Sequence, residues 1–200
     1  MLLSQWNAHP IFFKGNPTLK ENNKQLVIET QNASGGYVHL FSEPIPIGAN
    51  TRLDWKWAIA KFPQEVMQLP LKKSTDDFAV RIGLLLSDGT SRISLPGGLQ
   101  KSLPRDEPLS YVLFYCATPQ VDPKMVCELS PYHKSFVNCM KRASPKTERN
   151  SGFPLRDLIS AKNLGPKPSL KVLGLWLFAD SDNLETRSEA SVSELVLSNN

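Results

Sequence analysis

Two aspartates, Asp180 and Asp182, stand one residue apart where the apolar run from Val172 to Ala179 ends. Carboxylates in this position suit three kinds of chemistry. They can bind a cation such as calcium, they can form the acid pair of a glycan-cleaving enzyme, or they can hydrogen-bond nearby backbone and end a strand. The choice decides whether the protein is read as a catalyst or as a binding module.

The calcium loop of a helix–loop–helix hand does not fit the residues that follow. Leu184 stands where that loop needs an oxygen ligand, Glu185 where it needs glycine, and Ser191 where it needs a bidentate carboxylate. A looser calcium site on Asp180 and Asp182 stays open, because calcium accepts oxygens in varied geometry. We favour a strand-ending turn, and the sequence implies no other cofactor.

Paired carboxylates also hydrolyse glycosides. Asp76 and Asp77 precede another predicted strand, and Asp77 could meet Asp180 if the two strand ends lie together. Because adjacent aspartates rarely straddle a substrate, a hydrolase or lyase that uses Asp77, Asp180 and Asp182 is an alternative hypothesis. The sequence contains no Gly-x-Ser-x-Gly elbow for a serine nucleophile.

Arg81 is placed among leucine, isoleucine and valine in the run from Asp77 to Ser87. Its offset of four residues from Asp77 puts both side chains on one face of a strand. A buried arginine needs a carboxylate partner. We therefore predict a network that links Arg81 to Asp77, Asp180 or Asp182.

Aromatic side chains suggest a sugar-binding face, because a sugar ring packs on an aromatic ring while polar neighbours bind its hydroxyls. Trp55 and Trp57 alternate with polar residues and are expected in the core, whereas Tyr111 and Tyr132 are freer to bind. The candidate binding residues are Asp76, Asp77, Arg81, Tyr111, Tyr132, Asp180, Asp182 and Asn183.

Short strands are the predicted elements, since sixteen prolines and eleven glycines interrupt the chain and no sustained helical period is present. A hairpin is expected from Lys24–Gln31 and Tyr37–Ser42, and another across Asp88-Gly89. The stretch Ser144–Gly152 is expected to be a long loop. Further strands are predicted at Thr51–Phe62, Leu109–Ala117, Pro123–Leu129, Ser135–Ala143, Leu170–Asp180 and Ala190–Ser198.

One short helix is predicted between Phe153 and Gly165, because Pro154 suits a first turn and Gly165 is followed by Pro166. Together these elements predict an all-β fold, an antiparallel jelly-roll β-sandwich with one short helix. The 200 residues suit a single domain, 1–200.

Three cysteines match no zinc-binding spacing. Cys116 lies in an apolar run and is expected to be a small buried side chain. A disulfide between Cys127 and Cys139 is conceivable. The N-terminus has no signal-peptide pattern, which predicts a cytoplasmic protein, or a periplasmic or extracellular one if a leader was removed.

The net charge of +4 is concentrated in one segment that has few aromatic side chains on which bases could stack. We therefore predict no nucleic-acid partner, and no apolar run is long enough for a membrane span. The charged residues of the segment are Lys134, Lys141, Arg142, Lys146, Glu148 and Arg149.

Four segments, LDWKWAIAKFP, DDFAVRIGLLL, PLSYVLFY and GLWLFADSDNLETRSEASVSELVL, resemble in that order the bacterial domain-of-unknown-function 3047 family. The chain departs from the family pattern at Ser110, Leu113, Ser181 and Leu184. The resemblance implies a jelly roll similar to galactose-binding-like modules, in proteins that bacteria export, and it implies no established activity. The matching residues are Trp55, Trp57, Asp76, Asp77, Arg81, Tyr111, Asp180, Asp182 and Asn183.

The sequence thus favours a non-catalytic domain that binds a carbohydrate or a protein partner. The alternatives are a structural accessory subunit of a larger assembly and the glycan hydrolase or lyase. The sequence leaves the oligomeric state open.

Overall fold

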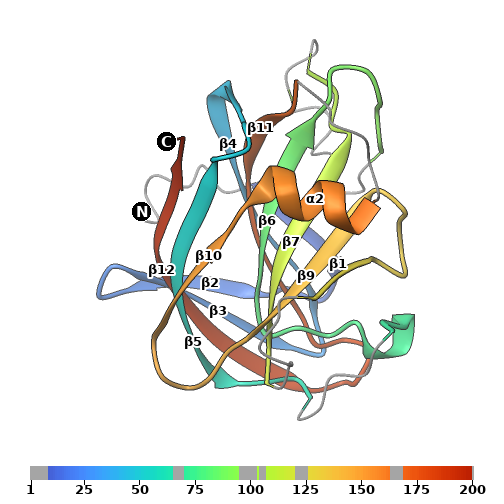
Figure 1. Cartoon of the computed structure of the whole chain (residues 1–200). Helices are drawn as coiled ribbons and strands as arrows, with labels where there is room; N and C mark the ends of the chain where they lie inside the picture. Colours follow the sequence, from blue (N-terminus) through green and yellow to red (C-terminus); the bar gives the residue numbers. More distant parts are fainter. Residues whose placement is uncertain are drawn as a thin grey trace.

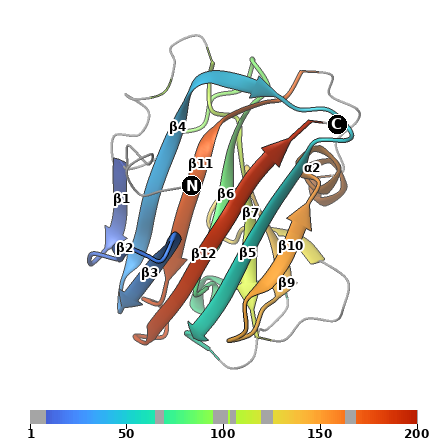
Figure 2. The same cartoon turned by 90° about the vertical axis from the view of Figure 1, so that its left-hand side faces the viewer.

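The computed structural model describes residues 9–64, 70–94, 103, 107–119, 126–162 and 169–199. These residues form two β-sheets packed face to face, with one α-helix, α2 (Pro154–Lys162), against one end of the sandwich (Figure 1). Figure 2 shows the five-stranded sheet in front of the seven-stranded one. The predicted all-β jelly-roll sandwich with one short helix is confirmed.

The larger sheet has the strand order β1 (His9–Lys14), β4 (Ser34–Pro46), β11 (Lys171–Asp180), β6 (Arg81–Ser87), β7 (Tyr111–Thr118), β9 (Phe136–Arg142) and β8 (Val126–Leu129). The smaller sheet has the order β10 (Glu148–Gly152), β5 (Arg52–Lys61), β12 (Arg187–Ser198), β3 (Gln25–Gln31) and β2 (Thr18–Asn22). Among these neighbours only β7 and β9 run parallel, which departs from the purely antiparallel prediction.

The main core lies between the two sheets. Along β5, Leu53, Trp55, Trp57 and Ile59 point inward and are at most 1% exposed, as their alternation predicts. Burying each of these side chains stabilises the fold by roughly 1.5–3 kcal/mol. The two tryptophans are therefore core residues and are not available to bind a ligand.

A second apolar cluster covers the outer face of the larger sheet, so that β6, β7 and β11 are buried on both faces. Leu71 and Phe78, which precede β6, and Ile93 and Leu109, which lie between β6 and β7, pack over this face. Double burial explains why these strands have continuous apolar runs. One end of this outer face holds the candidate site.

The two predicted hairpins are wrong. Strand β3 lies in the smaller sheet and β4 in the larger one, so the chain crosses between sheets there. Position 36 requires glycine because β4 and β11 lie close together there, and a Cβ would overlap the carbonyl of Leu177. Gly89 does adopt a left-handed turn, with a φ of 74°, but β6 already pairs with β7 and β11 and has no free edge for a hairpin partner.

The predicted loop Ser144–Gly152 is also wrong in its second half, which is strand β10 on an edge of the smaller sheet. An edge strand with one exposed face needs few apolar residues, so its sequence, ERNSG, lacks the usual strand pattern. Gly152 is required because a Cβ would collide with the ring of Tyr115.

The disulfide Cys127–Cys139 joins β8 to β9, and Cys116 is a buried free thiol, as expected. No helix in the described part of the chain has the length and apolarity that a membrane span requires.

Candidate functional site

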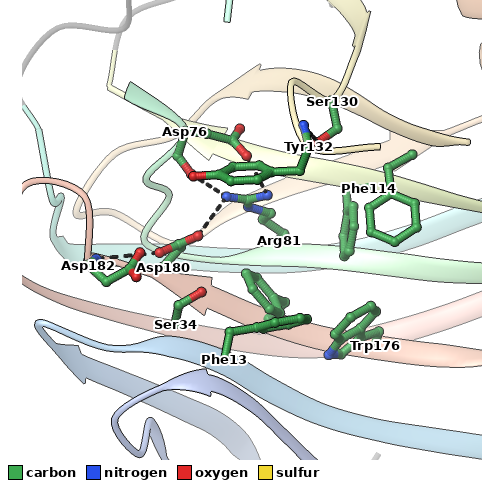
Figure 3. Close-up of a pocket in the computed structure, with 12 residues that line it drawn as sticks. Phe13, Ser34, Asp76, Arg81, Phe114, Ser130, Tyr132, Trp176, Asp180 and Asp182 are labelled. Atoms are coloured by element: carbon green, nitrogen blue, oxygen red, sulfur yellow. Dashed lines mark hydrogen bonds and ion pairs between the residues drawn. The ribbon is translucent and has the colours of Figure 1, made fainter. Parts of the chain in front are cut away.

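A cavity of about 190 Å³ opens on the outer face of the larger sheet, at the end where β6 begins and β11 finishes. Figure 3 shows charged and aromatic side chains converging on this space. The lining residues are Phe13, Ser34, Asp76, Arg81, Phe114, Ser130, Tyr132, Phe136, Trp176, Phe178, Asp180 and Asp182.

The register between β11, β6 and β7 determines where the aromatic side chains that line the cavity lie. Trp176 on β11 and Phe114 on β7 both pair with Gly83 on the intervening β6. A Cβ on Gly83 would lie 2.7 Å from the Phe114 ring and 3.1 Å from Cβ of Trp176, so only glycine leaves room for both. Phe178, two residues after Trp176, points to the same face and stands beside Arg81.

Arg81 is 5% exposed and lies between two carboxylates (Figure 3). Its Nη1 donates to Oδ2 of Asp76 at 3.3 Å, and its Nη2 donates to Oδ2 of Asp180 at 3.2 Å. Phenyl rings pack around the guanidinium, with the ring centres of Phe78 and Phe178 at 4.5 and 5.1 Å. The predicted arginine–aspartate network is confirmed through Asp180, and Asp76 is its second member.

Asp76 is fully buried and also accepts a hydrogen bond from Nδ2 of Asn138 at 3.3 Å. Burial raises the pKa of Asp76, while the positive charge of Arg81 opposes this rise. The backbone carbonyl of Asp76 accepts a further bond from Arg81. Asp76 therefore anchors the arginine from the segment that precedes β6.

Asp180 ends β11 and is 5% exposed. Burial raises the pKa of Asp180 to about 9, because the attraction of Arg81 is outweighed by desolvation and by the neighbouring Asp182 and Asp77. The backbone N–H of Asp182 donates to Oδ1 of Asp180 at 3.4 Å. Asp180 therefore stays largely protonated at neutral pH.

Asp77 holds the turn after β11. Its carboxylate accepts from Nδ2 of Asn183 at 2.7 Å, from the backbone N–H of Asn183 at 3.3 Å and from that of Leu184 at 2.9 Å. Oxygen atoms of Asp77, Asp180 and Asp182 lie within 4.8 Å of one another, a spacing that could hold a cation. Calcium here stays a prediction: the spacing favours it, and the nearby arginine opposes it.

Tyr132 covers the cavity from the connection between β8 and β9 and is 51% exposed. Its hydroxyl lies 3.0 Å from the carbonyl of Lys73 and 3.2 Å from Oδ1 of Asn183, so it can donate to either. The structure therefore joins Tyr132 and Asn183 at the rim.

Tyr111 is not near the other candidates. It pairs with Leu86 at the opposite end of β6, whereas Arg81 pairs with Cys116. Its hydroxyl donates to Oδ2 of Asp88 at 3.2 Å, and the residue is 7% exposed. Seven of the eight predicted binding residues thus lie together, and Tyr111 lies apart.

Sequence reasoning missed most of the aromatic wall. Trp176, Phe178 and Asp180 occupy alternate positions of one strand, which is the signal that could have placed them on one face. The apolar residues between them hid this alternation. The missed wall residues are Phe13, Phe114, Phe136, Trp176 and Phe178.

No family model matches the chain, and no curated protein matches it. The resemblance to the domain-of-unknown-function 3047 family therefore stays a prediction. Solved structures of similar fold include endoglucanase 3 of family GH12 from Trichoderma harzianum, with a TM-score of 0.47, 6% identity, and coverage of 98% of this chain and 86% of that chain.

The xyloglucanase domain of NopAA from Sinorhizobium fredii, solved with cellobiose, has a TM-score of 0.46 and 6% identity over 96% of this chain and 92% of that chain. The family 12 xyloglucanase from Bacillus licheniformis has a TM-score of 0.44 and 7% identity over 94% of this chain and 99% of that chain. With similarity this low, no activity of these enzymes is transferred to the present chain.

Proposed function

We propose that the protein is a non-catalytic carbohydrate-binding domain whose outer-face cavity holds one sugar ring. The observation that carries the proposal is one cavity that combines aromatic walls with buried hydrogen-bonding groups. A sugar ring packs its C–H face on aromatic rings, and each hydroxyl both donates and accepts. A volume of about 190 Å³ is below the roughly 300–1,000 Å³ of drug-sized ligand sites and suits a single ring.

Two residues that line the cavity carry a buried donor without a partner, which supports a ligand that brings oxygen acceptors. Nε of Arg81 and Nε1 of Trp176 have no hydrogen-bond partner among the described residues, although the two side chains are 5% and 1% exposed. A buried donor without a partner costs about 1–3 kcal/mol. A hydroxyl or ring oxygen within reach of either donor would recover part of that cost.

The position of Arg81 supports binding over catalysis. A glycosidase needs its two carboxyl groups on opposite sides of the scissile bond. Here the guanidinium of Arg81 fills the space between Asp76 and Asp180, and Asp77 is occupied by the turn at Asn183. All three carboxyl groups are therefore engaged by other parts of the protein.

The second candidate function is a glycan hydrolase or lyase, and the raised pKa of Asp180 favours it. A carboxylic acid that keeps its proton at neutral pH can act as a general acid, and Asp182 beside it could then serve as the base or nucleophile. Release of new sugar ends by the parent protein, lost in a folded Asp180→Asn variant, would establish this function.

The test of the binding proposal is a glycan array followed by calorimetry on the strongest glycan. Phe13→Ala removes an aromatic wall that is 48% exposed, so the fold should tolerate it and affinity should fall about tenfold. Val196→Ala is the matched control, because Val196 is 53% exposed on the other sheet. An array without any bound glycan, or equal affinity of both variants and the parent, would contradict the proposal.

The disulfide Cys127–Cys139 supports an oxidising compartment, which for a bacterial protein means the periplasm or the cell exterior. Mass spectrometry of protein isolated from its native host under alkylating conditions would test this. A fully reduced pair would contradict it.

A further inference from the structure

We infer that the cavity receives the sugar at the non-reducing end of a glycan chain and excludes the sugars inside the chain. The inference rests on the proposed function and narrows it to a substrate class, glycans that present a free chain end. It is carried by the way in which the residues around the cavity close it at both ends and leave an opening on one side.

The exposure of the lining residues shows where the cavity opens. Most of them are at most 9% exposed, whereas Phe13 and Tyr132 are 48% and 51% exposed. Figure 3 shows these two aromatic side chains on opposite sides of the cavity. The mouth of the cavity therefore lies between Phe13 and Tyr132.

The end of the cavity towards the middle of the sheet is closed by apolar packing. The ring centres of Phe114 and Trp176 lie 5.5 Å apart. Val112 and Leu85, the next outward-facing residues on β7 and β6, are 0% exposed within the second apolar cluster. Within the described residues, a sugar chain therefore has no path along the sheet beyond Phe114 and Trp176.

The other end is closed by hydrogen bonds between three segments. Asp77 accepts from the backbone N–H groups of Asn183 and Leu184, which ties the segment before β6 to the turn after β11. The hydroxyl of Tyr132 lies 3.0 Å from the carbonyl of Lys73 and 3.2 Å from Oδ1 of Asn183. The side chain of Tyr132 therefore bridges from the connection between β8 and β9 to these segments and covers this end of the cavity.

This closure decides which sugar of a chain can enter. A sugar inside a chain carries linkages on two sides of its ring, so its site must be open on two sides. A sugar at the chain end has one linkage and fits a cavity of about 190 Å³ with its mouth on one side. The second sugar then lies at the mouth, where the exposed rings of Phe13 and Tyr132 can pack on it.

The non-reducing end suits such a cavity better than the reducing end. A reducing-end sugar interconverts between two ring anomers and an open form, so a rigid cavity would bind only a fraction of the molecules at any time. The ring of a non-reducing sugar is fixed by its linkage and has no such cost.

The experiment uses a glycan array whose members include linear chains of glucose, galactose, mannose, xylose and N-acetylglucosamine, all attached through their reducing ends. Each chain, and any other glycan that the array binds, is printed uncapped and with one α-linked arabinose added at the non-reducing end. The cap leaves the original sugar present only inside the chain. We expect the uncapped form of a bound glycan to bind at least about tenfold more tightly than its capped form. If arabinose is itself the ligand, all capped chains should bind and the uncapped chains should not.

The variant Tyr132→Ala tests the closure directly. Removing the ring opens one end of the cavity, so the preference for the uncapped form should fall about tenfold, towards equal binding. The fold should tolerate this change because Tyr132 is half exposed, and the control Val196→Ala, on the other sheet, should keep the preference of the parent. An unchanged preference in folded Tyr132→Ala would contradict the closure argument.

The outcomes separate the inference from the function on which it rests. Equal or tighter binding of the capped forms by the parent protein overturns the inference and leaves carbohydrate binding in place. Binding of a free oligosaccharide in calorimetry that is lost when the same chain is printed would put the reducing end in the cavity and also overturns it. Failure of all glycans to bind, printed or free, overturns the proposed function as well. The comparison on the parent protein needs no variant, so it holds even if Tyr132→Ala fails to fold.

Discussion

At the scale of single residues, Arg81 and its two carboxylates decide how the site is built. A guanidinium cannot lose its proton, whereas a buried carboxyl group can gain one. Removing the arginine is therefore less damaging than removing one of its partners. Asp76 accepts hydrogen bonds from both Arg81 and Asn138. Replacing Asp76 therefore leaves two buried donors without their acceptor.

We predict that Asp76→Ala lowers the free energy of unfolding by roughly 3–5 kcal/mol, the usual cost of breaking a buried ion pair. Arg81→Met keeps the side-chain volume and should cost less. Urea denaturation of both variants measures the difference, with Asp54→Asn as a control for loss of one surface charge. A larger loss in Arg81→Met than in Asp76→Ala would contradict this account.

At the scale of elements, the hairpin of β8 and β9 supplies three residues that line the cavity, which we call its roof. Ser130, Tyr132 and Phe136 all come from it, and the disulfide Cys127–Cys139 ties its two strands together. The thiol of Cys116 belongs to the cluster on the outer face, whereas Cys139 faces the core between the sheets, so the two do not exchange.

Replacing both Cys127 and Cys139 by serine should lower the free energy of unfolding by roughly 3 kcal/mol, the loop-entropy value for cysteines twelve positions apart. Because the roof residues would be held less rigidly without the disulfide, affinity for the bound glycan should fall too. Urea denaturation and calorimetry measure the two effects, and a reducing agent should change the parent but not the double variant. Unchanged affinity in a destabilised double variant would show that the roof does not contribute to binding.

At the scale of the whole molecule, the buried acids make stability depend on pH. The pKa of Asp180 is about 9 in the folded protein and near 3.8 when unfolded, so between these values the folded state binds more protons. The stability that Asp180 contributes is therefore fully present below about pH 3.8 and is lost as the pH rises through about 9. The raised pKa of Asp76 acts in the same direction.

We expect the unfolding free energy of the parent minus that of Asp180→Asn to fall as the pH rises from about 3.8 towards 9, by at most about 1.4 kcal/mol per pH unit, because asparagine has no proton to lose. Urea denaturation at several pH values measures it, and Asp54→Asn controls for the loss of one carboxyl group. Parallel profiles for Asp180→Asn and the parent would show that Asp180 is ionised in the folded protein.

The exposed large apolar side chains of the described residues lie at several places. Phe13 and Tyr132 lie at the cavity, Leu129 ends β8, Leu184 lies in the turn after β11, and Val196 is on the other sheet. A protein partner and a structural accessory role both stay predictions, as does the oligomeric state.

Local sequence patterns determined the fold class and much of the site. Alternation placed Trp55 and Trp57 in the core, and the isolated charge of Arg81 in an apolar strand required a carboxylate partner. These features depend on strand periodicity and on the cost of burying charge, and both can be read from neighbouring residues.

Tertiary structure alone decided which strands became neighbours. It split the chain between two sheets at β3 and β4, made the polar segment β10 an edge strand, and set Trp176 beside Gly83 and Phe114. It also chose Asp76 over Asp77 as the second partner of Arg81 and left Tyr111 at the far end of the sheet. Pairing between strands distant in sequence follows from how two sheets bury their faces together, and no local pattern records it.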